Sequence, residues 1–174
     1  MGFKDLLKKV EASSEYAEMI EKYPDAELVA GFFIRDFVSN DNKESIDYKV
    51  GGEKVLTFNL KLDENGDDSE EKIVVHEDKL IDDAGRPSLV RIDKEINIEV
   101  DELKNIVGTR ALDEGISAKF SKIIAVLQKY DNKQIWNLTC MLEGLIILNI
   151  HVDALSGDVL KFERKSMMDL IKKK

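Results

Sequence analysis

Cysteine, histidine and proline are scarce in this sequence of 174 residues, and each shortage excludes a class of protein or site. The single cysteine, Cys140, excludes an intramolecular disulfide and a cysteine-rich metal site. The two histidines, His76 and His151, are not at ligand spacing, so no transition-metal site is expected. Only two prolines, together with 43% hydrophobic residues, are typical of a globular chain rather than a disordered one. We therefore expect a globular protein without a metal or other cofactor.

A long apolar run is also missing. The longest such run, residues 145–150, is far shorter than the ~18 residues that cross a bilayer, so no membrane span is expected. Charged residues interrupt the apolar positions of residues 1–16, and these residues contain no small-residue cleavage site, so they do not resemble a secretory signal. These features predict a soluble protein of the cytoplasm.

Positive charge is low over most of the chain. The net charge is −9, and residues 39–83 contain 14 aspartates or glutamates against 6 lysines. A nucleic-acid-binding protein concentrates lysine and arginine on one face, because binding releases counterions from the phosphates. Only the C-terminal residues 155–174 are net positive, with 6 basic residues against 3 acidic ones. A nucleic-acid partner is therefore not expected.

Residues that could perform catalysis or bind a cation occur in patterns that support neither function. Cys140 and His151 are a nucleophile and a base, but strand alternation places their side chains on opposite faces of a sheet. The acidic stretch 63–71 is similar to a calcium loop, yet Asp68 and Val74 stand where an EF-hand requires glycine and glutamate. No glycine-rich phosphate loop is present. The sequence therefore predicts no catalytic residues and a protein that is not an enzyme.

Hydrophobic periodicity divides the chain into three parts. Residues 1–77 are predicted to form a helix over 3–22 and an antiparallel meander. Residues 78–116 are predicted to connect the two larger parts through a short strand and a helix, and residues 117–174 to form a helix capped by Ser117 and a three-stranded meander. The predicted strands are 27–37, 45–50, 54–62, 72–76, 95–100, 135–142, 145–152 and 159–164.

Two strand ends in the predicted meanders have related sequences. Residues 58–63, FNLKLD, and residues 148–153, LNIHVD, share the order apolar, Asn, apolar, basic, apolar, Asp, and a Gly-Asp turn follows each. We interpret this agreement as a tandem duplication. An aspartate at a strand end accepts hydrogen bonds from turn amides, and glycine adopts the positive φ that reverses the chain. The predicted turn residues are Asp63, Gly66, Asp153 and Gly157.

The stretch Val152-Asp153-Ala154-Leu155-Ser156-Gly157-Asp158-Val159 resembles the PepSY family, and the resemblance extends over about residues 117–165. The N-terminal half resembles a divergent second copy, with Asp63 and Gly66 present and Glu64 in place of the alanine. The resemblance implies an α+β fold of two tandem cystatin-like units, each a helix packed on a curved antiparallel sheet. It also implies a non-catalytic role, because members of that family act as inhibitory propeptides of proteases or as modules beside membrane proteins.

The leading functional hypothesis is a non-enzymatic binding or regulatory protein that recognises a protein or peptide. Its partner would bind at the concave sheet or along an exposed strand edge. Four apolar residues lie opposite the predicted core stripes and form either a partner surface or further core: Val29, Phe33, Leu145 and Ile147.

Two other hypotheses remain open. The first is a small-molecule binder or enzyme with a pocket between helix and sheet, which would use Trp136, Tyr48 or Arg35. The second is a homodimer joined through its sheets, with Leu145 and Ile147 in the contact.

Overall fold

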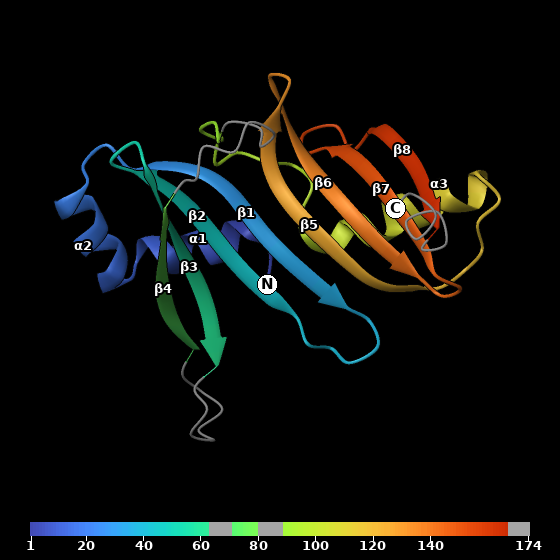
Figure 1. The fold of residues 1–174 in the computed structure, drawn as a ribbon, viewed down its shortest axis with the longest axis horizontal. Coiled ribbons are helices and arrows are strands. Elements are labelled where there is room, and N and C mark those ends of the chain that lie inside the picture. Colours follow the sequence, from blue (N-terminus) through green and yellow to red (C-terminus); the bar gives the residue numbers. More distant parts are fainter. Residues whose placement is uncertain (63–70, 80–88, 167–174) are drawn as a thin grey trace.

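A single antiparallel sheet of eight strands is the centre of the fold. The computed structural model describes residues 1–62, 71–79 and 89–166. The strands are β1 (Glu27–Asp36), β2 (Lys43–Val50), β3 (Lys54–Leu62), β4 (Glu71–Lys79), β5 (Phe120–Tyr130), β6 (Lys133–Leu142), β7 (Ile146–Asp153) and β8 (Val159–Ser166). Their order across the sheet is β4-β3-β2-β1-β5-β6-β7-β8, so β1 and β5 form the central pair (Figure 1).

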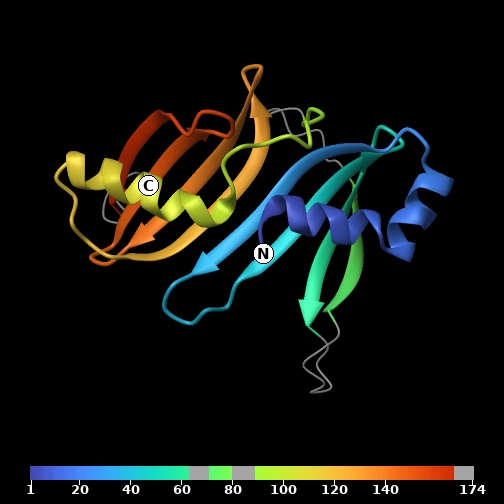
Figure 2. The ribbon, with the colours of Figure 1, turned by 180° about the vertical axis from the view of Figure 1, so that it is seen from behind.

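The helices lie on one face of this sheet. They are α1 (Phe3–Glu11), α2 (Ser14–Lys22), the short 3-10 helix η1 (Val100–Glu102) and α3 (Leu103–Asp113). Seen from behind, α1 lies over the strands of the first half of the chain and α3 lies over those of the second half (Figure 2). No helix in the described part of the chain is long and apolar enough to span a membrane.

The apolar face of α1 attaches it to the sheet. Phe3, Leu6, Leu7 and Val10 are buried, at spacings that place them on one side of the helix. Gly31 of β1 allows the close approach, since an added Cβ there would lie 3.2 Å from the Phe3 ring.

The expected fold of two tandem cystatin-like units is wrong. A unit of that kind has its own helix wrapped by its own sheet, whereas here eight strands share one sheet and a single hydrophobic core spans both halves. The physical reason is the pairing of β1 with β5, which joins the two meanders edge to edge. The interpretation of the chain as a PepSY-like tandem repeat is corrected with it.

The helix predicted from Ser117 is also wrong, because residues 120–130 form strand β5. Phe120, Ile123, Ile124 and Leu127 fit the three- and four-residue spacing of a helix, and this spacing caused the error. A central strand with apolar residues on both faces has no clean alternation, so it is easily confused with a buried helix. The C-terminal meander therefore has four strands and not three.

The other element predictions have mixed outcomes. The strands predicted at 27–37, 45–50, 54–62, 72–76, 135–142, 145–152 and 159–164 are confirmed as β1–β4 and β6–β8, and the helix in the connecting segment is confirmed as α3. The strand predicted at 95–100 is wrong, because this segment is irregular, although Asn97 and Ile98 donate to the Ala154 carbonyl. The helix predicted over 3–22 is divided into α1 and α2, where the Ser13 hydroxyl accepts the Tyr16 amide and caps α2.

A buried arginine joins the two halves beside the central strand pair. Arg35 of β1 is only 8% exposed. Its Nε donates to the Asp101 carboxylate at 3.1 Å, and an Nη lies 3.0 Å from the Glu44 carboxylate and 2.7 Å from the Met1 carbonyl oxygen. Arg35 therefore links β1, β2, η1 and the residues before α1.

The carboxylate of Glu99, in the segment that connects the two halves, caps α1. The Phe3 and Lys4 amides donate to Glu99 at 2.7 and 3.0 Å, although Glu99 lies in the second half of the sequence. These amides have no hydrogen-bond partner within the helix. A negative charge near the N-terminus of a helix also interacts favourably with the helix dipole. Glu99 thus fixes α1 against η1.

We predict that Arg35→Met lowers the free energy of unfolding by about 2–4 kcal/mol, because it removes the closer of the two cations beside the poorly solvated Glu44 carboxylate and leaves only the Met1 ammonium at 3.8 Å. Denaturant unfolding followed by circular dichroism measures this change. The control is Lys122→Met, which removes a half-exposed ion pair to Asp36 at 3.8 Å and is expected to change the value by less than about 0.5 kcal/mol. Equal losses in the two variants would contradict the role given to Arg35.

Candidate functional site

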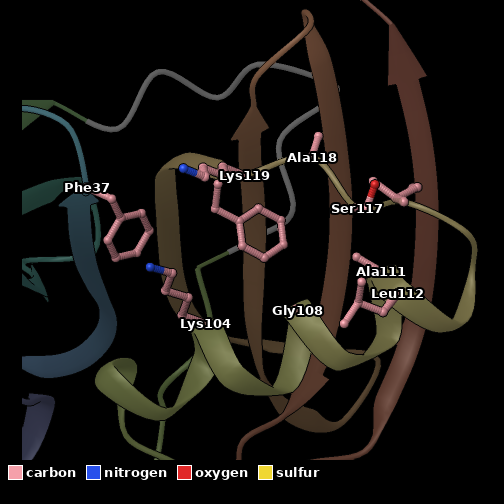
Figure 3. Close-up of a pocket in the computed structure, with 10 residues that line it drawn as sticks. Phe37, Lys104, Gly108, Ala111, Leu112, Ser117, Ala118 and Lys119 are labelled. Atoms are coloured by element: carbon pink, nitrogen blue, oxygen red, sulfur yellow. The ribbon is translucent and has the colours of Figure 1, made fainter.

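A groove of about 510 Å³ lies between α3 and the start of β5 (Figure 3). Residues from three segments line it: Phe37 after β1, Lys104, Gly108, Ala111 and Leu112 on α3, and Ile116 to Phe120 between α3 and the first residue of β5. The volume lies within the ~300–1,000 Å³ that is usual for ligand sites. This groove is the candidate site.

Helical spacing explains why α3 contributes to both the core and the groove. Leu103, Val107 and Ala111 are buried in the core at four-residue intervals. Lys104 and Gly108 follow them by one position, so they lie on the neighbouring stripe of the helix. The chain then reverses after α3, where the Ile116 amide donates to the Ala111 carbonyl oxygen at 2.8 Å. This reversal forms the wall opposite α3.

Two lysines give the groove a positive end. The Lys104 ammonium lies 4.1 Å from the centroid of the Phe37 ring, which is a cation–π contact. Figure 3 shows the ammonium groups of Lys104 and Lys119 on the side of the groove where Phe37 lies. Neither lysine forms an ion pair with any residue in the described ranges. Both charges are therefore available to an anion.

Gly108 forms part of the groove surface in the interior of α3. An added Cβ would meet only the Phe120 ring, at 3.6 Å, which is ordinary van der Waals contact. Its backbone is helical, so no positive φ requires glycine. Glycine inside a helix costs about 0.5–1 kcal/mol relative to alanine. The fold does not need this glycine, and its effect is to keep the groove open.

The structure does not bring the four candidate surface residues together. Val29 and Phe33 are buried, Leu145 is 61% exposed in the turn before β7, and Ile147 is half-buried on the face without helices. Strands β5 and β6 separate the first two residues from the last two. A bulge between Leu28 and Ala30 shifts the alternation of β1, and Phe33 consequently packs in the core.

One of the two predicted turns lies in the described residues. The Asp153 carboxylate accepts the Leu155 and Ser156 amides at 2.8 and 3.1 Å, and Gly157 follows with φ of 80°. Asp63, Gly66 and the acidic stretch 63–71 lie outside the described residues, apart from Glu71 at the start of β4.

Cys140 and His151 are not brought together. Cys140 is buried in the core, whereas His151 lies on the other face of the sheet and packs against Tyr130 with ring centroids 5.4 Å apart. Burial raises the pKa of the Cys140 thiol to about 12. Burial, followed by the charge of Lys161, lowers the pKa of His151. The described residues contain no cluster of His, Cys, Asp or Glu that could hold a metal ion.

The residues suggested for a pocket between helix and sheet do not line the groove. Trp136 is buried, donates from Nε1 to the Ile98 carbonyl oxygen at 2.8 Å, and contacts the Phe33 ring edge to face. Tyr48 packs between the rings of Tyr16 and Phe58. These side chains, with Arg35, are part of the packed interior.

Sequence reasoning missed the groove residues Phe37, Lys104, Gly108 and Lys119. Phe37 comes from the first half and the others from the second, so the groove depends on the pairing of β1 with β5. The one local signal was Gly108, a costly residue in the interior of a predicted helix.

We predict that Cys140 reacts with iodoacetamide about a thousandfold more slowly in the native protein than in guanidinium chloride. Its raised pKa leaves little thiolate in mildly alkaline buffer, and burial blocks access to the sulfur. Mass spectrometry of the quenched samples measures the two rates. Similar rates would show that the thiol is accessible and would reopen a catalytic role.

We predict that Gly108→Ala raises the free energy of unfolding by about 0.5–1 kcal/mol, because alanine favours the helix and its methyl group meets no clash. Gly144→Ala is the matched control. Gly144 has φ of 87°, so alanine there is strained and should destabilise the fold. Thermal unfolding of both variants measures the difference, and a loss of stability in Gly108→Ala would mean that packing requires the glycine.

Comparison with known proteins supports the fold and leaves the groove unassigned. No family model matches the chain, and no curated protein sequence matches it. The crystal structure of a "putative lipoprotein" from Clostridium difficile 630 is similar, with a TM-score of 0.55 and 15% sequence identity over 87% of this chain and 90% of that chain. At this identity the likeness shows a shared fold alone.

Proposed function

We propose that this chain is a non-enzymatic binding protein that holds a segment of a partner protein in the groove between α3 and β5. The observation that carries this proposal is an open, partly apolar groove lined by Gly108, a glycine that the fold does not require. A surface feature that lowers stability without a structural need is typical of a functional site.

The shape of the groove favours a protein segment over an enclosed small molecule. Leu112 is 64% exposed, and Lys104, Ser117 and Lys119 are exposed along the rim. Small-molecule sites commonly enclose 70–90% or more of the ligand surface. A partner segment instead inserts one or two side chains and covers the rim with its backbone. A large exposed leucine beside a cavity fits this second arrangement.

The buried position of Cys140 supports a non-enzymatic role. The thiol is the strongest nucleophile in the chain, but it lies in the core with its pKa raised, and the groove does not include it. Ser117 lines the groove without a histidine or carboxylate among the other lining residues to activate its hydroxyl.

The edge strands offer less to a partner than the groove does. β4 has exposed charged side chains at Lys72, Glu77, Asp78 and Lys79, and β8 has exposed charged side chains at Lys161 and Arg164. Charged edge strands prevent the addition of another strand. We therefore place the partner in the groove rather than along an edge.

We predict that a photo-reactive phenylalanine at position 112 cross-links a partner protein in the native cell, whereas the same group at Leu160 on β8 does not. Both leucines are exposed, but only Leu112 lines the groove. Mass spectrometry identifies the adduct and the cross-linked residue.

A second substitution tests whether the groove causes the cross-link. Gly108→Leu fills the groove and should abolish the adduct, whereas Asn105→Leu adds the same bulk to an exposed position of α3 outside it. Circular dichroism checks that both proteins are folded. An adduct that persists in Gly108→Leu, or one formed equally from position 160, would overturn the proposal.

A further inference from the structure

The groove has one positive end and one apolar end. Lys104 and Lys119 direct their ammonium groups toward the Phe37 end, while Ala111 and Leu112 lie farther along α3 (Figure 3). Gly108 lies between these ends on the helix. A ligand that fills the whole groove therefore needs a negative group at one end and an apolar group at the other.

Lys104 and Lys119 bring two positive charges to one end of a groove in an acidic chain. The net charge is −9, and several other lysines are paired with carboxylates, including Lys54 with Glu77, Lys94 with Glu11 and Lys122 with Asp36. Lys104 and Lys119 have no such partner among the described residues. A carboxylate supplied from outside would complete the same type of pair.

The Phe37 ring favours a fixed position for one of these charges. The ring contacts the Lys104 ammonium at 4.1 Å, and the contact leaves other donor directions of the ammonium open. A positioned donor loses less side-chain entropy when an anion binds. The contact with Phe37 therefore orients the Lys104 ammonium at this end of the groove.

We infer that the partner segment carries a carboxylate next to a large apolar side chain. This inference rests on the proposed function. The carboxylate binds between Lys104 and Lys119, and the apolar side chain lies on Gly108 against Ala111 and Leu112. Lysine ammonium groups bind phosphate as well as carboxylate, so the test below compares the two anions directly.

The test is selection from a phage-displayed pool of random nine-residue peptides against the full chain. We expect enrichment of aspartate or glutamate about fivefold at a position adjacent to leucine or phenylalanine, which corresponds to about 1 kcal/mol of selectivity. Selected peptides are then synthesised with the acid replaced by its amide or by phosphoserine, and their affinities are measured by fluorescence anisotropy.

Substitutions separate the charge requirement from the apolar one. Lys104→Gln with Lys119→Gln should weaken the acidic peptides about tenfold and leave their amide versions unchanged. Lys129→Gln with Lys133→Gln removes the same charge at the opposite end of β5 and should have no effect. Gly108→Leu should abolish binding of both peptide versions.

The outcomes distinguish the inference from the proposed function. Peptides that lose binding in Gly108→Leu but show no preference for an acidic residue would overturn the inference and leave the proposed function in place. Peptides insensitive to Gly108→Leu, or no enriched peptide at all, would overturn both. Tighter binding of the phosphoserine version would show that the positive end of the groove prefers a phosphate, and would overturn the inference of a carboxylate. Decanoate is added in a separate titration. If it shifts the amide resonances of residues 104–120 and displaces the peptides, the groove binds fatty acids instead.

Discussion

The antiparallel pairing of β1 with β5 is the contact on which the remaining structure depends. It aligns Gly31–Asp36 with Leu127–Lys122 and turns two four-stranded meanders into one sheet. With the sheet continuous, α1 and α3 lie on the same face and bury one core. The pairing continues past the end of β1, where the Phe37 amide donates to the Ser121 carbonyl oxygen at 2.9 Å. This last hydrogen bond places Phe37 beside the start of β5. A residue from the first half of the chain therefore lines a groove formed mainly by the second half.

The groove is a region where the chain gives up stability. An interior glycine weakens α3, and a largely exposed leucine leaves apolar surface in water. Elsewhere α3 follows the ordinary rule, with Leu103, Val107 and Ala111 buried at four-residue intervals. The buried residues and the groove residues lie on adjacent stripes of α3. The loss of stability at the groove is therefore local and does not mean that α3 is poorly formed. Local departures of this kind from the stabilising pattern concentrate where a protein binds something.

The sequence alone predicted the strands that have one apolar and one polar face. It failed for strands whose two faces are both apolar. β3 and β6 alternate apolar and polar residues, so their bounds and buried positions could be predicted. β5 is apolar on both faces and fitted a helical pattern equally well. The face of β1 depended on a bulge that only the pairing with β2 reveals. The groove could not be predicted, because it joins Phe37 to residues more distant in sequence through that same central pair. Sequence patterns report local periodicity, and this site is formed by long-range contacts.

The buried arginine that joins the halves also connects the elements on the two sides of the groove. Arg35 lies two residues before Phe37 on one wall, and its partner Asp101 lies one helical turn before Lys104 on the other. This ion pair of 3.1 Å therefore links the strand before Phe37 to the helical turn before Lys104, and the Lys104 ammonium lies 4.1 Å from the centroid of the Phe37 ring. A similar fold occurs in a protein that is only 15% identical, and a shared fold alone does not define a function. In the proposed function, specificity depends instead on the position of α3 relative to β1, because that position brings the charges of Lys104 and Lys119 and the surface at Gly108 into one groove.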